Sequence, residues 1–248
     1  SNLRFGTCAD GGTTVSERLR IDSSGRVLIG TTTEGEATAD NLTIADSGHC
    51  GITLRSGTSS VGTVFFSDGT SGAAEYRGYV QYDHGSNFLK WATDGSERMR
   101  LDSSGRLLIN QTQGYDLYAN GLLQVSATDG TAAISVTRWS DNGSSPYINL
   151  GKSRGSVGAY TIVQDDDRLG QINFTGADGT DLASPAAGIA GYVDGTPGSN
   201  DMPGRLVFFT ASDGGVAETE RMRLTSQGRL SIGSNQAHAT LVARSADD

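Results

Sequence analysis

The sequence has 248 residues, begins with Ser1 and carries a formal net charge of −9. Leu, Ile, Val and Phe together number 50, about 20% of the chain, which is close to the lower limit for a chain that builds a compact core by itself. The excess of acidic over basic residues argues against a nucleic-acid partner. A mean hydropathy of −0.32 without a long apolar run excludes membrane insertion, and two cysteines exclude a disulfide scaffold or a Cys-rich zinc module.

Short runs rich in β-branched and aromatic residues recur along the chain, each bounded by Gly, Asp or Ser. Examples are residues 52–54, 61–66, 133–137 and 205–210. Runs of this kind are typical of strands that are separated by turns. Apolar residues at helical spacing are scarce. The sequence therefore predicts an all-β chain with little or no α-helix.

One pattern occurs three times. Residues 16–30 read SERLRIDSSGRVLIG, residues 96–110 read SERMRLDSSGRLLIN, and residues 219–233 read TERMRLTSQGRLSIG. The first and third copies also match upstream without a gap, where Phe5 aligns with Phe208. Repetition over this distance predicts tandem structural units.

A second element follows the first two copies. Leu-Thr-Ile at 42–44 and then Ile-Thr-Leu-Arg at 52–55 resemble Leu-Gln-Val at 123–125 and then Ile-Ser-Val at 134–136. Because the first copy matches the third upstream as far as Phe5, we expect the chain to open inside a unit. The expected parts are the end of a preceding unit over 1–35, a repeat unit over 36–112, a longer unit over 113–235, and the start of a further unit or a tail over 236–248.

Each copy of the pattern predicts a β-hairpin. In the first copy, Asp22 opens a type I turn and Gly25 takes the left-handed conformation that completes a three-residue loop. Leu19 and Ile21 should lie on one face of the strand, and Arg18 and Arg20 on the other. The predicted turn residues of the three hairpins are Asp22, Gly25, Asp102, Gly105, Thr225 and Gly228.

The three copies hold nine of the 17 arginines. These arginines form either an anion-binding ladder or ion pairs with acidic neighbours within or between chains, and the planar guanidinium suits such pairs better than lysine does. We favour the ion pairs. The expected ladder comprises Glu17, Arg18, Arg20, Glu97, Arg98, Arg100, Glu220, Arg221 and Arg223.

The pattern Glu-Arg-Met-Arg-Leu-Asp-Ser-Ser-Gly-Arg-Leu-Leu-Ile resembles the repeat of tail fibres and tail-fibre-like proteins of tailed bacteriophages. Residues 169–181 and 193–208 resemble the same proteins. The resemblance implies an elongated homotrimeric fibre on the virion, extracellular, that links the tail to the host surface. Its partners would be further copies of itself and other tail or fibre proteins. Many such proteins end in an intramolecular chaperone that cuts itself off, and because this sequence contains no counterpart of it, we expect no self-cleavage.

The scarcity of apolar residues supports a trimer independently. A repeat unit with so little apolar area is marginal alone, whereas three chains can pool their apolar faces around one axis. The expected architecture is a homotrimeric fibre of tandem units, similar to a β-prism or a triple β-helix.

Three functions are compatible with these patterns. The first is a structural segment, a shaft or distal part of the fibre, that is not an enzyme and needs no cofactor. The second is a module that binds a host-surface glycan or receptor through aromatic side chains, which would otherwise pack in the core or between chains. The third is a polysaccharide depolymerase, which needs two facing carboxylates that the sequence does not identify. The candidate receptor-binding residues are Tyr76, Tyr79, Tyr82, Trp91, Trp139 and Tyr147.

No catalytic or metal site emerges from the remaining candidates. His49, His84 and His238 are far apart and lack metal-ligand spacing. Residues 165–167, three consecutive aspartates, either help to bind a cation or lie in a solvated turn, and we favour the turn. Cys8 and Cys50 are expected to be free, buried thiols.

Overall fold

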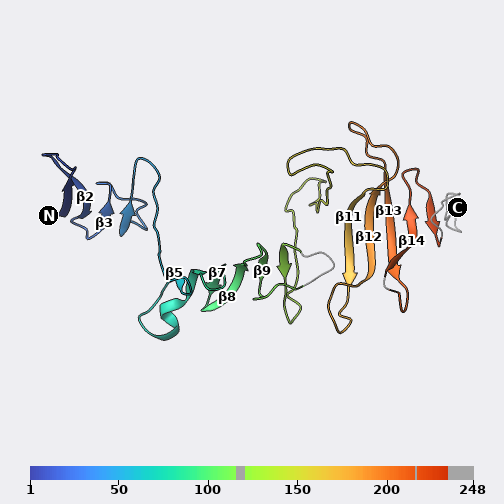
Figure 1. Ribbon diagram of the computed structural model, residues 1–248, viewed down its shortest axis with the longest axis horizontal. Helices are drawn as coiled ribbons and strands as arrows, with labels where there is room; N and C mark the ends of the chain where they lie inside the picture. The colour runs from blue at the N-terminus through green and yellow to red at the C-terminus, as the bar shows by residue number, and fades with distance from the viewer. Residues whose placement is uncertain (116–120, 216, 234–248) are drawn as a thin grey trace. The chain divides into compact units, whose positions relative to one another are not determined.

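The computed structural model describes residues 1–115, 121–215 and 217–233, and these residues form three β-sheets (Figure 1). The described residues include one short 3-10 helix, η1 (Gly72–Tyr76), and no α-helix. The expected all-β fold is therefore confirmed. Among the described residues, no helix has the length and apolar character needed to cross a membrane.

Two compact units make up the chain, Ser1–Thr63 and Val64–Asp248. The repeats predict a different division, at residues 35, 112 and 235, and that division stays a prediction. The expected further unit over 236–248 lies outside the described residues.

The first sheet has four strands in the order β1-β2-β3-β4. Its strands are β1 (Leu3–Cys8), β2 (Val15–Ile21), β3 (Val27–Ile29) and β4 (Leu42–Ile44). The first three strands are antiparallel, and β4 pairs with β3 in parallel. The strand that follows the first repeat copy thus extends the sheet that contains this copy.

The second sheet has six strands in the order β10-β9-β8-β7-β6-β5. Its strands are β5 (Val61–Phe66), β6 (Gly78–Asp83), β7 (Phe88–Thr93), β8 (Ser96–Leu101), β9 (Leu107–Ile109) and β10 (Leu123–Val125). The repeat copy forms β8 and β9, and β10 pairs with β9 in parallel. The second copy is therefore built in the same way as the first.

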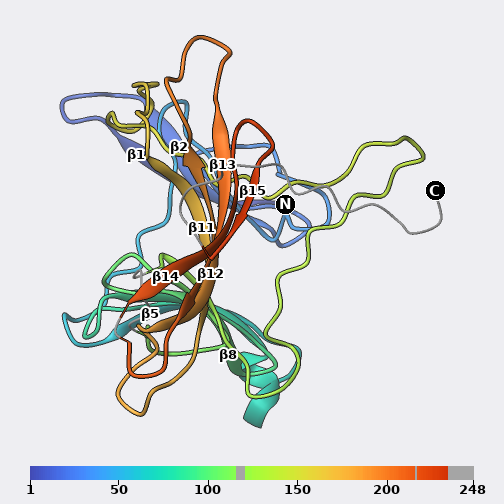
Figure 2. The same cartoon turned by 90° about the vertical axis from the view of Figure 1, so that its right-hand side faces the viewer.

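The third sheet has five antiparallel strands in chain order, and it is twisted (Figure 2). Its strands are β11 (Arg168–Thr175), β12 (Pro185–Val193), β13 (Gly204–Ala211), β14 (Glu218–Leu224) and β15 (Leu230–Ile232). The third repeat copy forms β14 and β15. A small cluster of Ala190, Val207 and Phe209 is buried on one face of this sheet, with Tyr192 packed against it.

Two of the four runs that predict strands are strands in the structure: residues 61–66 form β5, and residues 205–210 lie within β13. The prediction is wrong for residues 52–54 and 133–137, which belong to no strand. The local pattern of these two runs is that of a strand, but a strand also needs a hydrogen-bonded neighbour. Within the described part of the chain, neither run pairs with another strand.

Candidate assembly surfaces

The repeated hairpins are closed by the same hydrogen bonds. The Gly25 amide donates to the Asp22 carbonyl at 3.1 Å, and the Asp22 amide donates to the Arg26 carbonyl at 3.0 Å. The side chain of Asp22 also accepts from the amides of Ser24 and Arg26, at 2.8 and 3.0 Å. Gly25 has a φ of 83°, in the left-handed region that glycine adopts without strain.

The other two hairpins share this geometry. Asp102 accepts from the amides of Ser104 and Arg106, and Gly105 has a φ of 76°. In the third copy the Thr225 hydroxyl accepts from the Arg229 amide at 3.1 Å, and Gly228 has a φ of 74°. The structure thus places all six sequence-selected turn residues at the hairpin ends.

A β-bulge occurs at the same place in every copy. Phe5 faces Leu19 and Gly6 faces Glu17, so Arg18 is the extra residue that has no partner on β1. Arg98 and Arg221 are skipped in the same way in β8 and β14. Because side chains alternate along a regular strand, residues three apart would point to opposite faces. The extra residue shifts this alternation and brings Glu17 onto the face of Arg20.

The bulge creates an ion pair within one strand. The Arg20 guanidinium donates to both carboxylate oxygens of Glu17, with its Nη2 at 3.0 Å from Oε2. The same two-bond pair joins Glu97 to Arg100 in β8 and Glu220 to Arg223 in β14. We call the face that carries these pairs the ion-pair face.

The six sequence-selected arginines therefore divide into two kinds. Arg20, Arg100 and Arg223 pair with glutamates of their own strands, whereas the bulge residues donate to hydroxyls. Arg18 reaches Thr7, Arg98 reaches Thr93, and Arg221 reaches Thr210. The hydrogen bond from Arg20 lowers the pKa of Glu17 below its ordinary value of 4.5, and Glu220 raises the pKa of Arg223. The charges of Arg20, Arg100 and Arg223 are thus paired with carboxylates of the same chain.

The opposite face of each sheet is apolar. In the third sheet the register aligns one apolar residue from every strand in a single row: Ile172, Ile189, Phe208, Met222 and Ile232. A second row holds Leu206, Leu224 and Leu230. Residues aligned across neighbouring strands lie on one face. We call the face that carries these two rows the apolar face.

The first two sheets repeat this arrangement. In the first sheet the rows are Phe5, Leu19, Ile29 and Ile44, and Leu3, Ile21, Val27 and Leu42. In the second sheet they are Val80, Trp91, Met99, Ile109 and Val125, and Tyr82, Leu89, Leu101, Leu107 and Leu123. Equivalent positions of the three repeat copies, Leu19, Met99 and Met222, lie in equivalent rows.

The exposure of the two faces is opposite to that of a sheet in a soluble monomer. On the ion-pair face, Leu28 and Leu108 are 1% and 0% exposed. On the apolar face, Phe5 is 53%, Ile172 is 54% and Leu123 is 54% exposed. Contiguous apolar patches of this kind mark surfaces that bind another molecule.

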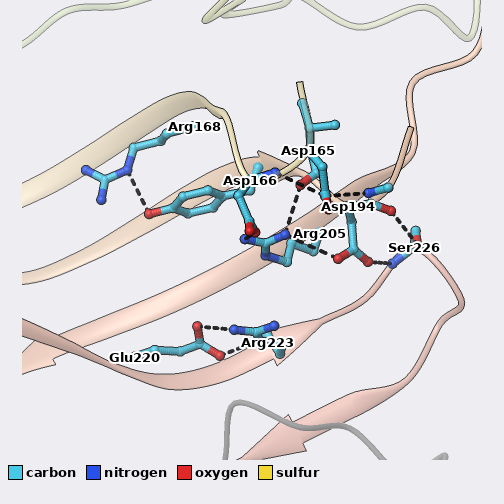
Figure 3. Close-up of polar contacts among 11 residues, drawn as sticks. Asp165, Asp166, Arg168, Asp194, Arg205, Glu220, Arg223 and Ser226 are labelled. Atoms are coloured by element: carbon cyan, nitrogen blue, oxygen red, sulfur yellow. Dashed lines mark hydrogen bonds and ion pairs between the residues drawn. The ribbon is translucent and has the colours of Figure 1, made fainter. Parts of the chain in front are cut away.

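A network of polar contacts fixes the ion-pair face of the third sheet (Figure 3). Arg205 on β13 pairs with Asp166 at 2.5 Å and with Asp194 at 3.3 Å, and its guanidinium lies 4.9 Å from the Tyr192 ring centre. The other carboxylate oxygen of Asp194 accepts from the Ser226 amide at 2.8 Å. These contacts tie the loop before β11 and the turn between β14 and β15 to the middle of the sheet.

The expectation that residues 165–167 lie in a solvated turn is wrong in one respect. Asp167 is only 8% exposed; it accepts two hydrogen bonds from Arg154, at 2.6 and 2.8 Å, and one from Lys152 at 3.0 Å. These bonds, the Arg154 pair foremost, hold the pKa of Asp167 well below its usual range. The Asp165 side chain accepts from the Gly195 amide. All three aspartates thus bind residues from other parts of the chain and hold the loop before β11 in place.

The candidate receptor-binding aromatics do not form one patch. Tyr82 and Trp91 lie in the two rows of the apolar face. Tyr79 instead contacts Phe65 edge to face, with ring centres 5.7 Å apart, and its ring centre lies 5.4 Å from the Lys90 ammonium group. Tyr76 belongs to η1 and is 44% exposed. The remaining two candidates, Trp139 and Tyr147, are 93% and 70% exposed and belong to no strand.

The cysteines and histidines form no site in the structure. Cys8 and Cys50 are both free, but they are exposed, so the expectation of buried thiols is wrong. His49 is exposed, His84 packs against Tyr82 with ring centres 4.9 Å apart, and His238 lies outside the described residues. Within the described ranges, no group of three or more His, Cys, Asp or Glu residues is arranged to hold a metal ion.

Sequence reasoning missed the network around Arg205. Its partners Asp166 and Asp194 lie far from it in the sequence, and Tyr192 comes from the neighbouring strand. The bulge was also missed, although one signal was available. The same Glu-Arg pair precedes an apolar residue, Leu19, Met99 or Met222, in all three copies, which points to a shared local geometry.

No protein-family model and no curated protein matches the sequence. Two solved structures from bacteriophage T5 are similar to the fold. The first is the carboxy-terminal domain of the L-shaped tail fibre, with a TM-score of 0.60 and 15% identity over 84% of this chain and 92% of that chain. The fold is similar to that of a phage tail fibre domain. The second is the same domain with its intra-molecular chaperone domain, with a TM-score of 0.61 and 13% identity over 88% of this chain and 69% of that chain. The expected likeness to tail fibres is thus confirmed for the fold. That the repeated sequence pattern is characteristic of tail fibres stays a prediction.

Proposed function

We propose that this chain is a structural segment of a phage tail fibre, a shaft or distal part, that assembles as a homotrimer on the virion and takes part in attachment to the host surface. One observation carries the proposal. Each of the three sheets exposes an apolar face of its own, with two apolar rows at equivalent positions of the repeat. The similarity to a tail fibre domain supports the same function.

The apolar face explains why several copies should associate. Burying apolar surface contributes about 25 cal/mol per Å², and a chain with so few apolar residues gains little of this by itself. Three copies that turn the apolar face of a sheet toward a common axis cover the rows of that sheet in every copy. The ion-pair faces then point outward, where their satisfied charges contact water at little cost.

The fibre role can be tested on phage particles. An antibody raised against the purified chain should label the tail fibres of purified virions in electron micrographs, and it should block adsorption to host cells. Labelling of the capsid, or no labelling of intact virions, would contradict the fibre role. Further tail or fibre proteins should co-purify with the labelled fibre.

A second candidate function is binding of a host-surface glycan. The observation that favours it is the exposure of Trp139 and Tyr147, because aromatic faces bind sugar rings when polar groups surround them. Trp139→Ala and Tyr147→Ala should then weaken binding of the purified protein to host cells without changing its oligomeric state. Release of reducing sugar ends from host polysaccharide would instead support the depolymerase.

A further inference from the structure

Two segments of the chain have a sequence pattern that predicts a β-strand, but neither forms a strand in the structure. Residues 52–55 follow β4, and residues 134–136 follow β10. Apolar residues alternate with polar residues in both: Ile52 and Leu54 flank Thr53, and Ile134 and Val136 flank Ser135. A strand-like sequence without a strand thus occurs at equivalent places after two of the repeat copies.

Both segments leave their apolar side chains and their backbones uncovered. Ile52 is 69% and Ile134 is 71% exposed. Neither segment makes a backbone hydrogen bond to any other described residue. Figure 1 accordingly draws no arrow between β4 and β5 or between β10 and β11. A chain with this pattern and free backbone groups is a ready template for pairing with another strand.

The first segment adjoins the surface that we propose to be buried in the trimer. Ile52, Gly51 and Cys50 line an open hollow of about 440 Å³ together with Leu42 and Ile44, which belong to the two rows of the apolar face. A molecule that covers the apolar face at β4 therefore reaches Ile52 as well.

The repetition identifies the partner. Each segment follows a hairpin and a parallel strand of the same design, so a partner that pairs with both segments must itself repeat. A second copy of this chain does so, because it contains the same two segments in the same order along its sequence. We propose that residues 52–55 and 134–136 become β-strands by hydrogen-bonding to neighbouring copies of this chain, and this inference rests on the proposed homotrimer.

Hydrogen exchange of the native protein tests the proposal. In the assembled protein, the amides of Thr53 to Arg55 and of Ser135 and Val136 should exchange at least about 100-fold more slowly than those of residues 140–145. Fast exchange at both segments in a protein of trimeric mass would overturn the strand pairing and leave the proposed trimer intact. A monomeric mass would overturn the trimer and the strand pairing together.

Proline variants give a second test, because proline removes one backbone donor and is not tolerated inside a paired strand. Ser135→Pro should weaken assembly and lower the melting temperature, and Thr53→Pro should do the same. Asp141→Pro is the matched control, since Asp141 is exposed and its amide makes no hydrogen bond among the described residues. Equal effects of Ser135→Pro and Asp141→Pro would overturn the proposal.

Discussion

Leu224→Asp tests whether the apolar face is buried between copies. Leu224 lies on β14 between Leu206 and Leu230, and it is 44% exposed in the single chain. Full burial of a leucine side chain contributes about 1.5 to 3 kcal/mol. Covering the exposed part in the trimer is therefore worth about 1 kcal/mol per copy, or about 3 kcal/mol per trimer. Burying a carboxylate there adds several kcal/mol for each copy, so we expect assembly to fail.

Gln227→Asp is the matched control for this variant. It adds the same charge to the same β14–β15 hairpin, at an exposed turn position that lies outside both apolar rows. Size-exclusion chromatography coupled to light scattering should show a monomer or aggregate for Leu224→Asp and an unchanged trimer for Gln227→Asp. If both variants have the same mass and the same melting temperature, the apolar face is not the surface between copies.

Three further variants test other parts of the structure. Gly105→Val should lower the free energy of unfolding by about 1 to 2 kcal/mol because a β-branched residue is strained at a φ of 76°, whereas Gly143→Val, in an open loop, should leave thermal denaturation unchanged; equal melting temperatures would contradict the turn assignment. Because the pKa of Glu17 is lowered in the folded state, the Glu17–Arg20 pair stabilises the fold fully above pH 4.5 and ceases to do so as the pH falls through the lowered folded value. The difference in melting temperature between the wild type and Glu17→Gln should therefore shrink below pH 4.5, and a constant difference would refute the ion pair. Arg205→Ala should lower the free energy of unfolding, measured by urea denaturation, by about 2 kcal/mol, because it removes the ion-pair partner of the partly buried Asp194. An effect no larger than that of Arg138→Ala, at an exposed arginine, would show that the network is not stabilising.

The local parts of the fold could be predicted from the sequence because local chemistry decides them. Asp22 and Gly25 define a turn whatever surrounds it, since the carboxylate binds nearby amides and the glycine accepts a positive φ. The alternation of Leu19 and Arg20 places them on opposite faces of β2 for the same reason. The apolar and ion-pair faces follow directly from this alternation.

The remaining features depend on residues that are distant in the sequence. The Glu17–Arg20 pair needs a bulge, whose position is set by the register of β2 against β1. The Arg205 network joins residues up to 39 positions apart, and no local pattern encodes that spacing. Distant residues also explain the wrong strand predictions at residues 52–54 and 133–137, because a local strand pattern forms a strand only where a pairing partner is available.

The native mass of the purified protein tests the central claim most directly. Light scattering coupled to size exclusion should give about three times the 25.8 kDa of one chain, and the mass should persist on dilution because three sheets per copy contribute apolar surface. A mass of 25.8 kDa would contradict the account, since the exposed apolar faces would then have no second copy to cover them.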